Sequence, residues 1–439
     1  MGGRGGSGGT SNGGASGTGG APPVLWDWVG VVGTGQSLAV GGHGNAPAMP
    51  LGATTQRFRN LKLSLGNASV PPFDPANNML SMVPLVETIR PIATGYPSPY
   101  PRNIYGETFH TAMADELSTL VMAAQGHDFV TAHTVVGEAG QAIAILQKGA
   151  TDTGSTGRAY AASLFEVAAI ARLAKAQGKT YGVGAIVLTH GESDAGSSTF
   201  EADMVKLWQS YNQDLRGLTG QTTAAPIPML LSQQHSAPTN AGSGAPATLA
   251  QWRIGLDHPG DIICTGPKYQ YAYVNDSTHL TNPDYERLGE KYGEVMYRRV
   301  VLGEAWQPLQ PTTVERSGRI ITVHFHVPAS PMAWDTTLPM PHQTAFTEWA
   351  QGRGFEVRSG TTRIAITSVA IAGDSVQITC ATDLPASGLV VGYAITADGT
   401  LRPNGTAHWG QLHDTDAFVG SLTRAAQANY AVSFEMPVP

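Results

Sequence analysis

Residues 25–301 alternate between short apolar runs and longer segments of helical periodicity, and this alternation restricts the fold more than any other feature. The apolar runs predict strands, and the periodic segments predict helices. Strands and helices in this order form a parallel sheet covered by helices on both faces. Active sites of such sheets lie at the carboxyl ends of the strands. The predicted strands are 25–32, 129–136, 182–188, 227–231 and 261–264; the predicted helices are 109–124, 158–177, 200–216 and 283–301.

After residue 307 the pattern changes to short β-branched runs separated by Gly, Pro and Asp turns, at 319–327, 362–371, 375–381 and 389–395. This pattern is typical of a small antiparallel β-sandwich or β-rich module, with one short helix near 343–350. We expect three regions: a leader at 1–22, an α/β domain at 23–307 and a β-rich accessory domain at 308–439. Within the α/β domain, residues 41–101 predict a long, loop-rich stretch.

The leader is dominated by glycine, with 11 glycines in its first 20 residues and no large apolar side chain except Met1. Such a segment buries nothing and is typical of a flexible tether. It has two interpretations: a cloning linker, or the spacer of an exported protein whose signal or lipid-bearing cysteine has been replaced. The second interpretation predicts a secreted or surface-displayed protein, with a lipid anchor in the native precursor left open.

Composition excludes several classes of protein. Only 13% of the residues are charged and the net charge is -7, with no basic run of the kind that binds nucleic acid. No apolar stretch reaches the roughly 18 residues of a membrane span. Cys264 and Cys380 match no metal or redox spacing and are expected to be buried thiols, with a disulfide as the alternative. His324 and His326 share a strand face, but without a visible third ligand we expect no metal.

Three polar motifs follow predicted strands or precede the last predicted helix. Gly33-Thr34-Gly35-Gln36-Ser37 places a serine on a glycine-flanked turn, which exposes the hydroxyl and frees a backbone N–H. The segment 189–194, Thr-His-Gly-Glu-Ser-Asp, crowds polar groups at the end of a buried strand. Asp276 lies three residues before His279, where a carboxylate can orient the imidazole. Taken singly, the serine motif is more readily a simple turn and the Asp276–His279 pair more readily a structural histidine, while the segment 189–194 is as compatible with a helix cap as with a functional site. Their order along the chain favours one hydrolytic site.

These motifs resemble those of the SGNH/GDSL-type hydrolases, in the sialate O-acetylesterase-like branch that includes the acetylxylan esterases of carbohydrate esterase family six. Gly35-Gln36-Ser37 is similar to the family's nucleophile block, and Asp276 and His279 match its Asp-x-x-His. Residues 105–109 and 137–143 resemble two supporting blocks. The resemblance covers about residues 25–305 and implies a flavodoxin-like three-layer α/β/α domain.

The resemblance also implies roles for individual residues. Ser37 would be the nucleophile, His279 the base and Asp276 its orienting acid, with Glu192 as a supporting carboxylate. Gly140 would donate an oxyanion N–H, and Gln36 would lie in the oxyanion or substrate region. His190 stands where the family has glutamine, so it would donate to the oxyanion or bind substrate. Asp194 would be structural. No metal or cofactor is implied.

The function expected from these residues is removal of O-acetyl groups from a carbohydrate, such as acetylated xylan, through an acyl-enzyme on Ser37. One alternative keeps this chemistry on sialate, other short-chain or polyester substrates. Another is a non-catalytic glycan-binding protein on the same fold. The aromatic residues Trp26, Trp28, Trp208 and those of 269–273 would serve as sugar platforms or as core. Oligomeric state is left open.

Overall fold

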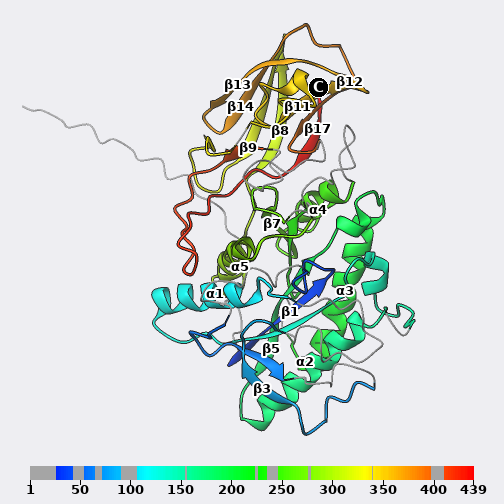
Figure 1. Cartoon of the computed structure of the whole chain (residues 1–439), viewed down its shortest axis with the longest axis vertical. Helices are drawn as coiled ribbons and strands as arrows, with labels where there is room; N and C mark the ends of the chain where they lie inside the picture. The colour runs from blue at the N-terminus through cyan, green and yellow to red at the C-terminus, as the bar shows by residue number, and fades with distance from the viewer. Residues whose placement is uncertain are drawn as a thin grey trace, which may run out of the picture.

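The protein is described by a computed structural model, which covers residues 26–42, 54–64, 72–89, 106–153, 156–222, 226–234, 246–274, 278–338, 340–396 and 410–439. It combines an α/β part with a β-rich part, one above the other in the view of Figure 1. The predicted leader 1–22 and Asp276 lie outside the described residues. Within the described ranges, no helix is both long enough and apolar enough to span a bilayer.

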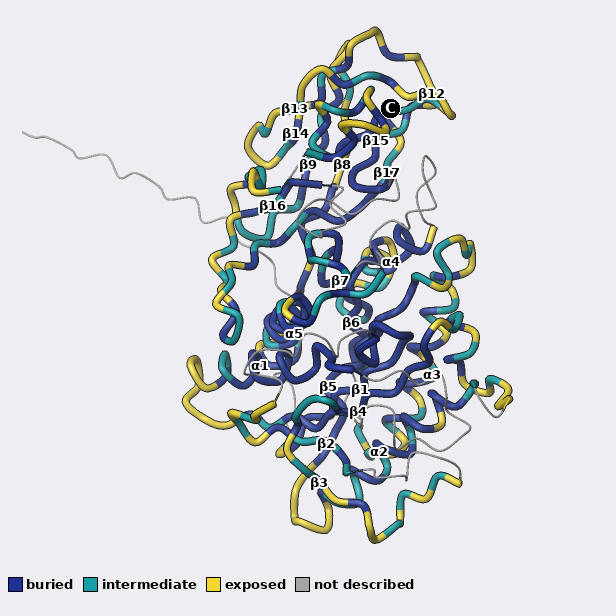
Figure 2. The backbone as a smooth tube through the Cα atoms, viewed as in Figure 1, coloured by how far each residue is buried: buried dark blue, intermediate teal, exposed yellow. Residues whose placement is uncertain are grey.

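The α/β part is built on a seven-stranded sheet in the order β3-β2-β4-β1-β5-β6-β7. Six neighbouring strands run parallel, and β3 is antiparallel at the edge. Every residue of the three central strands is buried, as expected for strands covered on both faces (Figure 2). The strands are β1 (Trp28–Gly35), β2 (Leu61–Ser64), β3 (Ser81–Pro84), β4 (Thr131–Gly137), β5 (Tyr181–Thr189), β6 (Met229–Gln233) and β7 (Ile262–Pro267).

Helices cover both faces of this sheet (Figure 1). One face carries α1 (His110–Gln125) and α5 (Asn282–Met296), which pack on one another; α5 continues into a π-helical turn, Tyr297–Val301. The other face carries α2 (Ala159–Ala176), α3 (Phe200–Thr219) and α4 (Pro246–Asp257). The central strands β1, β4, β5, β6 and β7 have the sequential order 2-1-3-4-5 of one doubly wound sheet type.

The predicted alternation of strands and helices in the α/β part is confirmed, with ends shifted by up to about three residues. The stretch 41–101 is only partly a loop, because it contributes the edge strands β2 and β3. Helix α4 has no counterpart among the predicted helices. Cys264 and Cys380 are free, buried thiols, so the preferred interpretation of the cysteines holds.

The β-rich part contains two four-stranded antiparallel sheets, β13-β14-β9-β8 and β12-β11-β15-β17. Phe325 of one sheet lies 6.0 Å, between ring centroids, from Phe434 of the other, so aromatic side chains fill the space between them. The strands are β8 (Gln310–Ser317), β9 (Ile320–His326), β11 (Phe355–Ser359), β12 (Thr362–Arg363), β13 (Ile366–Ala372), β14 (Ser375–Cys380), β15 (Leu389–Tyr393) and β17 (Phe434–Val438), besides the short pair β10 (Ala333–Trp334) and β16 (Leu412–His413). The helix predicted at 343–350 is a single 3-10 turn, Thr347–Trp349.

A segment at 414–430, here called the arm, leaves the β-rich part and runs down beside α5 and α1; it is the red trace in Figure 1. Buried carboxylates accept hydrogen bonds from its backbone. Glu290 of α5 accepts the backbone N–H groups of Leu422 and Thr423 at 2.7 and 2.8 Å, and Glu116 of α1 accepts that of Ser421 at 2.7 Å. The arm therefore satisfies acids that the α/β part buries on its own helices.

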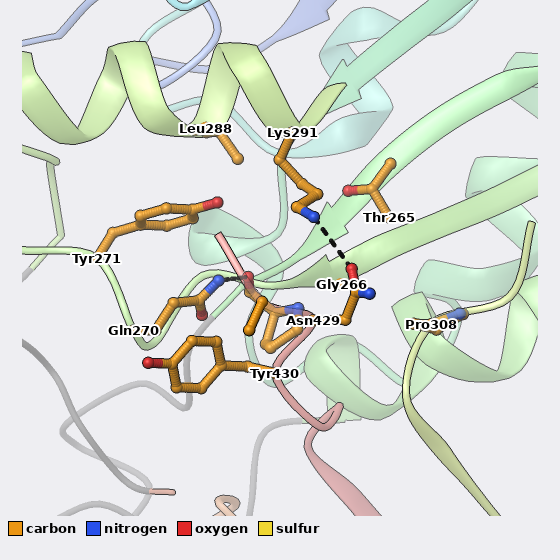
Figure 3. A pocket seen from close by; sticks show the side chains of 11 residues that line it. Thr265, Gly266, Gln270, Tyr271, Leu288, Lys291, Pro308, Asn429 and Tyr430 are labelled. Carbon is orange, nitrogen blue, oxygen red and sulfur yellow. Dashed lines mark hydrogen bonds between the residues drawn. The ribbon is translucent and has the colours of Figure 1, made fainter. Parts of the chain in front are cut away.

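The junction between the arm and the sheet contains a small pocket, shown in Figure 3, which is lined by the end of β7 and the residues after it, by α5, by Pro308 and by residues 428–430. Lys291 of α5 points into it and donates to Asn429 Oδ1 at 3.1 Å. The same ammonium group pairs with Glu294 at 2.7 Å. This pocket lies at a polar contact between the two parts of the chain and is not a cleft over Ser37.

Candidate active site

Ser37 follows strand β1 at the carboxyl edge of the sheet, on a turn that requires glycine at position 35. Gly35 has φ of 143°, and a Cβ built there would lie 2.0 Å from the carbonyl oxygen of Thr189. The backbone then turns back on itself, because the N–H groups of Val40 and Gly42 both donate to the Ser37 carbonyl, at 3.2 and 2.6 Å. Ser37 is thus held on a rigid turn between β4 and β5.

His279 reaches the same point from a loop more than 240 residues later. Its Nε2 lies 2.7 Å from Ser37 Oγ, a hydrogen-bonding distance. Backbone bonds fix this loop: Val274 N–H donates to the His279 carbonyl at 2.8 Å, and Thr281 N–H donates to that of Ala272 at 3.0 Å. The structure therefore brings together the two residues that the sequence singled out as nucleophile and base.

Gly42 completes the packing around this pair. A Cβ at Gly42 would stand 2.8 Å from Ser37 Cβ and 2.9 Å from His279 Cδ2, closer than real side chains pack. Ser37 itself is only 6% exposed. A hydroxyl with an imidazole nitrogen at hydrogen-bonding distance, in a site from which most water is excluded, can lose its proton on attack at an electrophilic carbon.

Gly140 lies in the loop that follows β4, the strand beside β1. It is exposed and left-handed, with φ of 68°, and Glu138 N–H just before it donates to the Gly35 carbonyl at 2.9 Å. The Glu138 carboxylate accepts the N–H groups of Arg158 and Ala159 at 2.8 and 2.9 Å, which caps the start of α2. The loop of Gly140 is thus tied to the turn of Ser37 and to a helix end.

His190 is wholly buried and faces this loop rather than open space. Its Nε2 lies 2.9 Å from the Gln141 carbonyl, and since a carbonyl only accepts, this nitrogen carries the proton and donates. Burial lowers the pKa of His190, so the ring is neutral near pH 7. Asp194 of the same segment accepts Ile143 N–H at 2.7 Å. His190 and Asp194 therefore hold both sides of the segment 141–143, which follows Gly140.

Gln36 and Glu192 bond to one another within the protein. Gln36 Nε2 donates to Glu192 Oε2 at 2.9 Å, and Gln36 Oε1 accepts Ser193 N–H at 3.2 Å. Lys268 Nζ donates to the other Glu192 oxygen at 2.8 Å. Both polar ends of the Gln36 side chain are thus used inside the fold. Lys268 is not among the residues singled out in the sequence: it lies four residues beyond the predicted strand 261–264, and only the observed end of β7 at Pro267 places it directly after a strand.

Three histidines outside this site, His110, His133 and His324, have structural partners. His324 Nδ1 lies 2.8 Å from Ser375 Oγ on the neighbouring strand. His110 and His133 place their Nδ1 atoms 3.1 Å apart beneath β1, where burial lowers the pKa of His133 to about 3. Among the described residues, no group of three or more His, Cys, Asp or Glu side chains has a metal-binding arrangement.

Solved structures of similar fold include a carbohydrate acetylesterase from Xanthomonas citri, with a TM-score of 0.52 and 14% identity over 93% of this chain and 80% of that chain. A protein from Arabidopsis thaliana matches with a TM-score of 0.42 and 15% identity, over 64% of this chain and all of that one. NanS matches with a TM-score of 0.36 and 10% identity, over 62% and 98%. No family model and no curated protein matches the sequence. At these identities the likeness to the Xanthomonas citri enzyme shows a shared fold across both parts of the chain.

Proposed function

We propose that the protein is a serine esterase that removes O-acetyl groups from an acetylated carbohydrate. The observation that carries the proposal is the 2.7 Å contact between Ser37 Oγ and His279 Nε2 at the carboxyl edge of the parallel sheet. An esterase needs a hydroxyl made nucleophilic by an adjacent base. The fold shared with a carbohydrate acetylesterase supports this chemistry.

The reaction would proceed in two steps. Ser37 Oγ attacks the ester carbonyl while His279 Nε2 takes its proton, and the alcohol of the sugar leaves with a proton returned by the same imidazole. Water then attacks the acetyl-Ser37 ester while His279 takes its proton; the bond between the acyl carbon and Ser37 Oγ breaks, the imidazole returns the proton to that oxygen, and acetate departs. In this proposal, Asp276 orients the imidazole.

The oxyanion of each step would be stabilised by the backbone N–H groups of Ser37 and Gly140. His190 acts on this hole indirectly, because its ring donates to the Gln141 carbonyl rather than into the site. Glu192 likewise acts through Gln36, to which it is hydrogen-bonded at 2.9 Å. Of the residues singled out in the sequence, Ser37, Gly140 and His279 are therefore proposed to contact the reacting ester.

A first experiment tests the chemistry. Hydrolysis of p-nitrophenyl acetate by the full chain is compared with that of Ser37→Ala and His279→Ala, each expected to lower kcat by at least about a thousandfold. Ser317→Ala, at the exposed end of β8, is the matched control and is expected to keep the wild-type rate. Wild-type rates in both site variants would exclude the proposal.

A second experiment tests the substrate. Acetate release is measured on acetylated xylan, pectin, mannan and sialosides, alongside a p-nitrophenyl series of increasing acyl length. We expect the highest rate on one acetylated polysaccharide and a steep decline beyond the acetyl group. A rate that rises with chain length would point to a lipid substrate, and polysaccharide binding without acetate release would favour a glycan-binding protein.

A further inference from the structure

Lys268 is the residue at the carboxyl edge whose burial most needs an explanation. It follows β7 directly, and its side chain is 1% exposed. An ammonium group removed from water costs several kcal/mol unless it is paired and hydrogen-bonded. The pairing is supplied by Glu192, whose Oε1 lies 2.8 Å from Lys268 Nζ and whose side chain is 13% exposed.

This ion pair continues directly to the turn of the serine. The second oxygen of Glu192 accepts Gln36 Nε2 at 2.9 Å, and the other end of the Gln36 amide accepts Ser193 N–H at 3.2 Å. Gln36 is the neighbour of Ser37 in the chain. A displacement of the Glu192 carboxylate therefore moves Gln36, and with it the backbone that positions Ser37.

On its other side, Lys268 is tied to the loop of the histidine. Its carbonyl accepts the Tyr273 hydroxyl at 3.0 Å and the backbone N–H of Tyr271 at 3.2 Å. The segment 271–274 pairs in turn with the histidine loop, through the bond from Val274 N–H to the His279 carbonyl. A continuous set of hydrogen bonds thus joins the turn of Ser37 to the loop of His279 by way of one lysine.

We propose that Lys268 is a positioning residue, which acts through Glu192 and Gln36 to hold Ser37 in line with His279. The proposal rests on the proposed esterase function for its kinetic readout. Its physical basis is that a charged hydrogen bond with a buried donor and a largely buried acceptor has a narrow range of geometries, so a shift of one loop displaces the other. Without the ammonium, Glu192 loses the counter-charge that Lys268 supplies, so we expect the carboxylate to turn towards water and to displace Gln36, to which it is hydrogen-bonded.

The test compares Lys268→Met with the double variant Lys268→Met/Glu192→Gln. In Lys268→Met we expect kcat for p-nitrophenyl acetate, per titrated active serine, to fall at least tenfold while KM stays within about twofold. The added Glu192→Gln removes the negative charge that Lys268 had paired with and keeps an oxygen for Gln36 Nε2. The double variant should therefore have a kcat at least threefold higher than that of Lys268→Met. Lys179→Met is the matched control, because its ion pair with Asp27 is 3.5 Å long and nearly half exposed on both sides.

A merely structural role predicts a different result. Lys268→Met would then lower the melting temperature while kcat per titrated serine stayed at the wild-type value, and this outcome would overturn the proposal. Should Lys268→Met fail to fold, Lys268→Gln takes its place, because the amide retains a donor towards Glu192 without the charge. An unchanged kcat in that variant would refute the positioning role equally.

A second readout separates this proposal from the esterase function. A fluorophosphonate probe reacts with an activated serine: Ser37 Oγ bonds to phosphorus, fluoride leaves, and the serine proton passes to His279. If the wild type is labelled but hydrolyses no acyl ester, the esterase proposal fails, and a tenfold slower labelling of Lys268→Met still supports the positioning role. Equal labelling rates, or no labelling of the wild type, would overturn it.

Discussion

Gly42→Ala introduces a single methyl group between the two residues of the proposed site. The new Cβ would lie 2.8 Å from Ser37 Cβ, 2.9 Å from His279 Cδ2 and 3.0 Å from His279 Nε2. Ordinary contact begins near 3.4 Å, so the neighbours must retreat by about 0.6 Å. A retreat of this size along the line between the two side chains stretches the 2.7 Å contact to about 3.3 Å, at the limit of a hydrogen bond.

Misplacement of reacting groups by a fraction of an ångström costs roughly 10- to 100-fold in rate, or about 1.4 to 2.7 kcal/mol of activation free energy. We therefore expect Gly42→Ala to lower kcat on p-nitrophenyl acetate by that factor. The variant keeps the N–H that donates to the Ser37 carbonyl, so the turn itself should survive. The assay is steady-state kinetics on protein whose melting temperature has been checked.

Gly217→Ala is the control for this change. Gly217 lies in α3, and a Cβ there meets nothing within 4 Å, so the substitution should leave kcat unchanged and stabilise the helix by about 0.5 to 1 kcal/mol. A wild-type kcat in Gly42→Ala would refute the reasoning, because it would show that the Ser37–His279 contact does not depend on the space beside Gly42.

Three further predictions concern the surroundings of the site. Burial and neighbouring carboxylates raise the pKa of Glu286 to about 8, while an unfolded glutamate has a pKa of about 4.3, so its contribution to stability is fully present below the unfolded pKa and is lost as the pH rises through the folded one. Glu286→Gln should therefore raise the melting temperature at pH 8 to 9 and flatten its decline between pH 5 and 9 in thermal unfolding scans, and an unchanged pH profile would contradict this. His190→Gln should keep kcat on p-nitrophenyl acetate within about threefold, because an amide N–H can replace the donor to the Gln141 carbonyl, whereas His190→Ala should lose about tenfold; equal rates in the two variants would refute the role of that bond. Glu290→Ala leaves the half-buried N–H groups of Leu422 and Thr423 without this acceptor and should destabilise the protein by about 3 kcal/mol, with faster proteolytic cleavage within 414–430; an arm that stays resistant would show that other contacts hold it.

The sequence predicted the parallel sheet because buried strands are continuous apolar runs, and such runs are visible without knowledge of the fold. The ends of the runs are a poorer guide: the apolar pattern predicts that β1 stops at Val32, whereas its ladder with β4 and β5 continues through the glycines to Gly35. Helix α4 escaped prediction because its few turns follow a stretch rich in Ser, Ala, Gly and Pro, which indicates a loop.

For the site, too, some features could be predicted from the sequence and others could not. Ser37 and His279 could be expected to meet because one follows the first predicted strand and the other precedes the last predicted helix of the same α/β domain, and the structure places them in contact. The direction of His190 could not be predicted, because spacing places a residue at a strand end without fixing its side-chain rotamer. Lys268 was missed because lysine is rarely buried, so its residue type argues against the position that it holds. The role of Asp276 stays a prediction.

The arm has a consequence for how this chain can be divided. Ser421, Leu422 and Thr423 supply backbone donors to carboxylates that belong to helices of the other part of the molecule. A fragment cut near residue 307 would keep those acids and lose every one of these donors. The boundary near residue 307 that the sequence indicates is therefore not a position at which the two parts can be separated without loss. Replacement of the β-rich part would require the arm to be rebuilt, or Glu116 and Glu290 to be replaced by neutral residues.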